Sequence, residues 1–141
     1  MKVVVYSNRI IAALIKDSTT TQILFNKFFE FIAPNFIISE INKYKLEITG
    51  KAGITEDEFE ILLNIIFENV KIIPEEDYKY FNERLIKEIS DQKDMLYMAV
   101  CLACNAEGIW THDPHLLNQK RVPTFTNINL LRFCGEARNT D

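Results

Sequence analysis

Three acidic residues stand at predicted junctions between strands and helices, where carboxylates can hold a metal ion. Glu40 follows a short apolar run, and Asp94 opens the apolar helix predicted over residues 95–106. Asp113 closes the strand predicted over residues 108–111. In a parallel α/β sheet these junctions share one edge, which is where ligands bind. Converging carboxylates repel one another unless a cation neutralises them, so the sequence predicts a divalent metal site in a metal-dependent enzyme.

Polar residues next to these positions are candidates for supporting the site. Asp91 either contacts the ion or caps the late helix by accepting backbone N–H groups. Thr111 could hydrogen-bond a ligand carboxylate or a metal-bound water. Ser7 and Asn8 could do the same beside Tyr6, or serve as ordinary helix caps. We therefore expect Thr111, Ser7 and Asn8 to orient the ligands rather than to hold the ion themselves, whereas Asp91 is also a candidate metal ligand.

Basic residues near the acidic positions suggest a path for an anionic polymer such as RNA. The candidates are Arg9, Lys43 and Lys45, with Lys120 and Arg121 further along the chain. Isolated basic residues on helix faces are usually just solvated, which is the alternative interpretation. The net charge of −4 and the pI near 5.3 argue against nucleic-acid binding through overall charge. A local patch or a metal-bridged contact remains open.

Predicted strands and helices alternate along the chain. Strands are expected at residues 2–6, 36–38, 70–73, 108–111 and 123–126. Helices are expected at residues 9–16, 22–32, 40–49, 55–67, 75–89, 95–106 and 128–133. The spacing of Thr55 and Glu58 is that of a capping box. This alternation predicts an α/β fold, a three-layer α/β/α sandwich around a central, mainly parallel five-stranded sheet. Residues 1–134 form the expected domain, followed by a flexible tail at 135–141.

The ordered motifs resemble the PIN domain, the nuclease fold of the toxin in many type II toxin–antitoxin pairs. The resemblance covers residues 2–133 and rests on four short segments. These are VVVYSN at 3–8, the stretch from Pro34 to Ile41, DQKD at 91–94 and GIWTHD at 108–113. It implies a metal-dependent endoribonuclease that uses Mg²⁺ or Mn²⁺ to hydrolyse RNA phosphodiesters. It also implies an antitoxin protein as partner and a homodimer or higher homo-oligomer.

The family's acidic set consists of four residues, of which this chain keeps three. The family has an Asp ending the first strand, a Glu after the second, an Asp opening the late helix and an Asp after the fourth strand. The matching positions hold Tyr6, Glu40, Asp94 and Asp113. The resemblance therefore assigns the metal and the catalytic role to the three acids.

Tyr6 supports a rival hypothesis, in which a degenerate PIN domain binds RNA or a protein partner without cutting. A neutral phenol, whose ordinary pKa is about 10, is a poor ligand for Mg²⁺. Its ring is also large enough to fill the volume of a metal ion and its waters. The phenol could instead hydrogen-bond Asp94 or Asp113 and hold the acidic residues together without a cation. The hypothesis predicts weak metal affinity and low or absent nuclease activity.

The cysteines and the apolar segments bear on where the protein acts. Three cysteines without a signal peptide predict an intracellular, cytoplasmic setting, and the longest apolar stretch is too short to span a membrane. Cys101 and Cys104 with His112 and His115 spell a C-x₂-C…H-x₂-H pattern that invites a zinc interpretation. We favour core cysteines, because both lie in an apolar helix and the histidine spacing is shorter than zinc sites favour.

Overall fold

A single five-stranded sheet forms the centre of the molecule. The computed structural model describes residues 1–89 and 91–140, and of residues 136–140 it describes the backbone alone. The sheet order is β3-β2-β1-β4-β5, and each neighbouring pair is parallel. The strands are β1 (Lys2–Val5), β2 (Glu30–Pro34), β3 (Val70–Ile73), β4 (Ile109–Trp110) and β5 (Thr124–Phe125). All five carboxyl ends therefore lie at one edge, as the sequence predicted.

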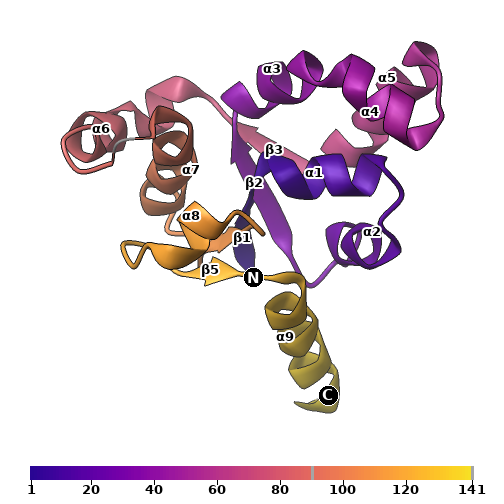
Figure 1. Ribbon diagram of the computed structural model, residues 1–141. Helices are drawn as coiled ribbons and strands as arrows, with labels where there is room; N and C mark the ends of the chain where they lie inside the picture. Colours follow the sequence, from indigo (N-terminus) through magenta and orange to yellow (C-terminus); the bar gives the residue numbers. More distant parts are fainter. Residues whose placement is uncertain (90, 141) are drawn as a thin grey trace.

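Helices cover both faces of this sheet, which confirms the predicted α/β class. Helices α6 and α7 lie on one side of the strands, and α1 and α2 lie on the other (Figure 1). Helices α3 to α5 lie beyond the carboxyl edge on the α1 side. The helices are α1 (Ser7–Leu14), α2 (Ser18–Leu24), α3 (Phe36–Lys43), α4 (Lys45–Ala52), α5 (Glu56–Phe67), α6 (Glu75–Leu85), α7 (Gln92–Ala103), α8 (Pro114–Asn118) and α9 (Asn127–Thr140).

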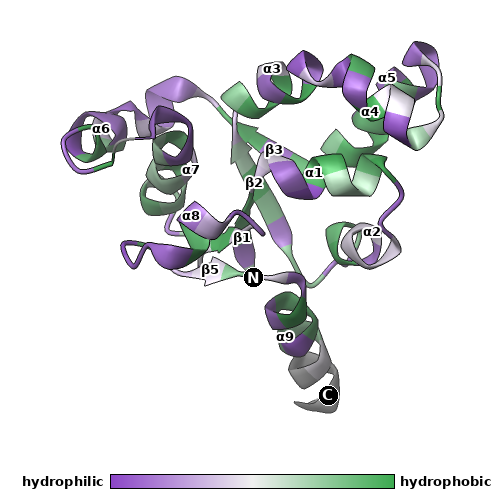
Figure 2. Cartoon of the chain, in the orientation of Figure 1, coloured by the Kyte–Doolittle hydropathy of each residue, from purple (hydrophilic) through white to green (hydrophobic). Residues whose placement is uncertain are grey.

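The hydrophobic core lies on both faces of the central strands, with α7 on one side and α1 and α2 on the other (Figure 1). Val3, Val4 and Val5 of β1 are fully buried, as β-branched residues in a central parallel strand are expected to be. Helix α7 packs against β1 and β2 and is buried along most of its length. Most of α7 is hydrophobic, whereas α6, farther from the sheet, is mostly hydrophilic (Figure 2). The core thus fixes the start of α7, and with it Asp94, against the sheet edge.

The prediction of a strand at residues 36–38 was wrong, because this apolar run begins helix α3. Ile37, Glu40 and Ile41 are buried while Ile38 is exposed, which is the spacing of one helical face rather than of a strand. Glu40 consequently lies in the body of α3 and not in the first turn of a later helix. The helix predicted at 40–49 is divided at Tyr44 into α3 and α4, and Gly53 ends α4 with a left-handed φ of 67°.

The helix predicted at residues 22–32 was also wrong. Asp17 accepts a hydrogen bond from the backbone N–H of Thr20 at 3.0 Å, so helix α2 starts at Ser18, before the predicted start at residue 22. Helix α2 then ends at Leu24, and the chain from Glu30 to Pro34 pairs with both β1 and β3. Pairing with two strands at once decides the conformation of this segment, and no local sequence signal reports such pairing.

Other boundaries follow the sequence more closely. The capping box is confirmed, since Thr55 and Glu58 each accept a hydrogen bond from the other's backbone N–H. Strand β3 has the predicted bounds, and β4 and β5 are shorter than expected. Helix α9 continues to Thr140, past the predicted end at residue 133, so the chain is helical where we expected the tail. Asp141 lies outside the described residues. No helix in the described part of the chain is long and apolar enough to cross a bilayer.

Candidate functional site

Tyr6 lies between two of the predicted acidic residues at the carboxyl edge of the sheet. It follows β1 directly, and its side chain is buried. Its hydroxyl donates to Oδ1 of Asp94 at 3.0 Å and to Oδ2 of Asp113 at 3.3 Å. A phenol has one proton to donate, so the two carboxylates share it. The predicted hydrogen bonding of Tyr6 to these acids is therefore confirmed for both of them.

Glu40 is held by two other side chains. Its Oε1 accepts a hydrogen bond from the Tyr97 hydroxyl at 2.7 Å, and its Oε2 forms an ion pair with the Lys93 ammonium group. The Glu40 side chain is only 4% exposed, whereas that of Lys93 is 37% exposed. A buried carboxylate requires such partners, because an unpaired buried charge is strongly destabilising. Helix α7 supplies both of these partners to α3.

Aromatic contacts join the two halves of the site into one unit. The rings of Tyr6 and Tyr97 lie 4.6 Å apart between centroids, and the Lys93 ammonium lies 5.7 Å from the Tyr6 ring centroid. The second distance is within the range of a cation–π interaction. We call the whole unit the acid cluster. Its members are Glu40, Asp94, Asp113, Tyr6, Tyr97 and Lys93.

Burial shifts the proton equilibria of the acid cluster. Desolvation, followed by the charge of Asp94, raises the pKa of the Tyr6 phenol far above its ordinary value. Desolvation likewise raises the pKa of the Tyr97 phenol. Both phenols are therefore neutral donors at physiological pH. Burial also raises the pKa of Asp94, and the hydrogen bond from Tyr6 opposes that shift.

The acid cluster does not present an arrangement that fits a divalent ion. Among the described residues, no three His, Cys, Asp or Glu side chains are grouped so that they could hold a metal. Magnesium prefers several oxygen ligands at short range with room for its waters. Here the Tyr6 hydroxyl occupies the position between Asp94 and Asp113, and Glu40 shares no donor with either. A metal would have to displace the phenol before both aspartates could coordinate it.

Two of the expected supporting residues, Asp91 and Thr111, accept hydrogen bonds from nearby backbone N–H groups. Neither Ser7 nor Asn8 caps α1, whose N-cap is Tyr6. Asp91 accepts from the backbone N–H groups of Lys93 and Asp94, so its interpretation as a helix cap is confirmed. Asp113 similarly caps α8, with its Oδ1 accepting from the His115 N–H at 2.9 Å. Thr111 is fully buried and accepts from the backbone N–H of Asp113 at 3.0 Å. Asp91 and Thr111 thus position the neighbouring aspartates through the backbone.

Arg9 belongs to a second polar network at the same edge, which we call the amide cluster: Asn127, Arg9, Thr20, Trp110 and His112. Its centre, Asn127, accepts from the Trp110 indole at 2.8 Å and from Arg9 at 3.4 Å. The Asn127 side-chain amide donates to Thr20 at 3.1 Å, and its backbone N–H donates to His112 at 3.2 Å. Arg9 is itself buried and donates to Asn8 and Thr20. The Arg9 side chain is therefore buried and hydrogen-bonded inside the protein.

The other basic candidates lie on α3 and α4. Lys43 is exposed, and Lys45 forms an ion pair with Glu60 at 2.9 Å. Their contact with RNA stays a prediction. Lys120 is exposed, and Arg121 pairs with Glu88.

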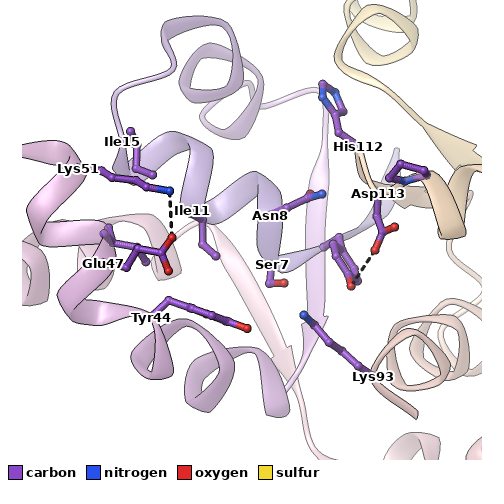
Figure 3. Close-up of a pocket in the computed structure, with 13 residues that line it drawn as sticks. Ser7, Asn8, Ile11, Ile15, Tyr44, Glu47, Lys51, Lys93, His112 and Asp113 are labelled. Atoms are coloured by element: carbon purple, nitrogen blue, oxygen red, sulfur yellow. Dashed lines mark hydrogen bonds and ion pairs between the residues drawn. The ribbon is translucent and has the colours of Figure 1, made fainter. Parts of the chain in front are cut away.

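An open pocket of about 440 Å³ adjoins the acid cluster. Its wall includes Tyr6 and Asp113, so the acid cluster forms one side of it. Ser7, Tyr44 and Lys93 point toward the middle of this pocket, while Glu47 and Lys51 pair at the end farther from Asp113 (Figure 3). Of the three acids only Asp113 lines this pocket, so a ligand there would meet Asp113, Tyr6 and Lys93 first.

Sequence analysis did not identify Lys93 and Tyr97. Lys93 directly precedes Asp94 in the motif DQKD, and Tyr97 follows Asp94 by three residues on the same helix. Residues three apart lie on one helix face, so the spacing could have placed Tyr97 near the site. The spacing could not show that both would reach Glu40, because that contact requires α3 to lie against α7.

Comparison with known proteins agrees with this architecture. Residues 4–128 match the PIN domain family. The chain is also similar to one in the crystal structure of VapBC2 from Rickettsia felis bound to a DNA fragment from their promoter. That similarity has a TM-score of 0.64 at 14% sequence identity and covers 89% of this chain and 98% of the other. No curated protein sequence matches the chain. With the family match over most of its length, the chain belongs to the PIN domain family.

Proposed function

We propose that this protein is a PIN domain of the toxin type that binds RNA but does not cleave it through a bound metal. RNA as the ligand is supported by membership of the PIN domain family. The observation that argues against cleavage is the Tyr6 hydroxyl, 3.0 Å from Asp94 and 3.3 Å from Asp113. Hydrolysis of a phosphodiester needs an activated water and neutralised charge, which one or two metal ions supply in metal-dependent nucleases. The phenol supplies neither.

A second function, the metal-dependent endoribonuclease, is supported by the placement of the three acids. Glu40 and Asp94 are each 5% exposed, and Asp113 lies at the same carboxyl edge beside the open pocket. If Tyr6 rotates away in the presence of Mg²⁺ or Mn²⁺, these residues are the available ligands. The two functions differ in one step, which is the displacement of the phenol.

An antitoxin partner is part of the same proposal. The structural neighbour is a VapBC2 assembly bound to DNA, and the toxin-type resemblance implies a partner protein for this chain as well. A homodimer or higher homo-oligomer remains a prediction of that resemblance, and a cytoplasmic location remains a prediction from the cysteines. Co-purification with the product of an adjacent gene would test the partner directly.

The experiment that separates the two functions uses mixed-sequence fluorescent RNA with the purified protein in Mn²⁺ or in EDTA. We expect the wild-type protein to bind this RNA by fluorescence anisotropy and to leave it intact in both buffers. Tyr6→Asp is expected to gain Mn²⁺-dependent cleavage, because it restores the fourth carboxylate. The matched control is Tyr6→Asp combined with Asp94→Asn, which removes one ligand again and should lose that cleavage.

Two results would overturn the proposal. Wild-type cleavage in Mn²⁺ that Asp94→Asn abolishes would establish the metal-dependent nuclease instead. Failure of the wild-type protein to bind RNA at low salt would contradict the RNA-binding function, because contacts with phosphates are strongest there.

A further inference from the structure

Lys93 reaches from helix α7 to the buried carboxylate of Glu40 on α3. It is the residue before Asp94, and its ammonium also lies 5.7 Å from the Tyr6 ring centroid. The lysine therefore contacts both halves of the acid cluster. Because its side chain is 37% exposed and borders the open pocket, its charge lies where the cluster meets solvent.

The donors of the acid cluster divide into two kinds. Tyr6 and Tyr97 are neutral and satisfy carboxylate oxygens without changing the net charge. Lys93 brings a positive charge and pairs with the acid that Tyr6 does not reach. A divalent cation combines both roles in a single ion, since it attracts several carboxylate oxygens and neutralises them. In this chain the two roles are carried by different side chains on different elements.

We propose that Lys93 and Tyr6 jointly replace the divalent cation of this site, with Lys93 neutralising Glu40 and Tyr6 joining Asp94 to Asp113. The inference rests on the proposed function and extends it to a residue outside the family's acidic set. The acid cluster then stays assembled in metal-free protein. An acid at position 6 would give the site only weak affinity for a divalent metal ion. Lys93 would still be paired with Glu40 and would repel an incoming cation.

The positions of the charges support the expectation that Lys93 weakens metal binding even after Tyr6 is replaced by an acid. A cation between Asp94 and Asp113 would take the place of the Tyr6 hydroxyl, on whose ring Lys93 already lies. The Lys93 ammonium, 5.7 Å from the Tyr6 ring centroid, would repel a cation at that position, and burial strengthens the repulsion by lowering the effective dielectric constant. A cation held by the aspartates alone would also lack the third carboxylate. Removing the lysine charge relieves both effects at once.

The test is titration of Mn²⁺ by isothermal calorimetry into a set of matched variants. We expect no binding by the wild-type protein or by Lys93→Met, because Tyr6 is still present in both. We expect Tyr6→Asp to bind weakly, and Tyr6→Asp with Lys93→Met to bind at least about tenfold more tightly. The control is Tyr6→Asp with Lys51→Met. Lys51 lines the same pocket but pairs with the exposed Glu47, so its removal should leave the Tyr6→Asp affinity unchanged.

Equal Mn²⁺ affinity of the two double variants would overturn the proposal, as would tight Mn²⁺ binding by the wild-type protein. If Tyr6→Asp does not fold, Tyr6→Asn supplies a neutral oxygen ligand at the same position and the same comparison is made with it. Circular dichroism in EDTA checks folding of each variant. The RNA cleavage assay separates the two proposals, because wild-type cleavage bears on the proposed function, whereas the Lys93 effect is read from metal affinity alone.

Discussion

The acid cluster and the amide cluster lie at the same edge of the sheet and are built on opposite principles. In the amide cluster, Asn127 both donates and accepts, so its partners are satisfied by one uncharged side chain. In the acid cluster, three carboxylates supply acceptors only, and two phenols and an ammonium must be brought from other elements. Polar groups that serve the fold are usually satisfied among themselves. Titratable groups whose pKa is shifted by burial cluster at functional sites, and Asp94 in the acid cluster is such a group.

The amide cluster should be the more costly of the two to disrupt. Asn127→Ala leaves the fully buried Trp110 indole N–H without its acceptor, and it removes one of the two donors to the Thr20 hydroxyl, which still accepts from Arg9. We expect the free energy of unfolding to fall by about 3 kcal/mol, since a buried donor left unpaired costs about 1–3 kcal/mol. Urea unfolding followed by Trp110 fluorescence measures this. Asn118→Ala, at an exposed position on α8, is the control and should change stability little. Equal effects of the two substitutions would contradict the structural role of the amide cluster.

Tyr6→Phe tests the acid cluster with a smaller expected loss. The substitution keeps the buried ring and its contact with Tyr97 but removes the donor of Asp94 and Asp113. Stability should fall by about 2 kcal/mol in EDTA, because Asp94 is buried and loses a hydrogen bond to a charged group. Tyr44→Phe, in the wall of the same pocket, should cost less than about 0.5 kcal/mol. A neutral or stabilising Tyr6→Phe would show that the hydroxyl does not hold the aspartates.

Asp94→Asn should have the smallest effect and the opposite sign. Burial raises the pKa of Asp94, so the folded state binds a proton more readily than the unfolded state. Stability therefore falls as pH rises from the ordinary aspartate pKa of about 3.9 through the raised folded value, and the cost is fully present above it. The amide avoids this cost and can still accept from Tyr6. We expect a small gain in stability at pH 7 that shrinks as the pH falls toward the ordinary aspartate pKa of about 3.9. Urea unfolding at the two pH values checks it, and a loss at pH 7 would contradict burial as the dominant influence.

The sequence predicted the class of fold and the proximity of Asp94 and Asp113 at the sheet edge, because both depend on short local patterns. The run Val3-Val4-Val5 indicated a central strand, and the spacing of Thr55 and Glu58 indicated a helix start. The secondary structure predicted from the sequence was wrong for the segments that form β2 and α3, because their apolar residues suited either a helix or a strand. The burial of Ile37 and Ile41 but not Ile38 distinguishes helix from strand there, and that burial is set by tertiary contacts.

The partners of the acids were less predictable than the acids themselves. The hydrogen bonds of Tyr6 followed from its position after β1, between Asp113 after β4 and Asp94 in the first turn of α7. The roles of Lys93 and Tyr97 depend on the packing of α3 beside α7, which no spacing within one helix reports. The amide cluster joins residues 9 and 127 across almost the whole chain, and an asparagine carries no signal of such a role in its local sequence.

The most direct test of the central claim is a crystal structure of the wild-type protein grown in millimolar MnCl₂, with anomalous diffraction data. We expect no anomalous peak between Asp94 and Asp113, and the Tyr6 hydroxyl within hydrogen-bond distance of both carboxylates, as it is here. A manganese peak at that position, with the Tyr6 ring turned away and Glu40 released from Lys93, would contradict the account.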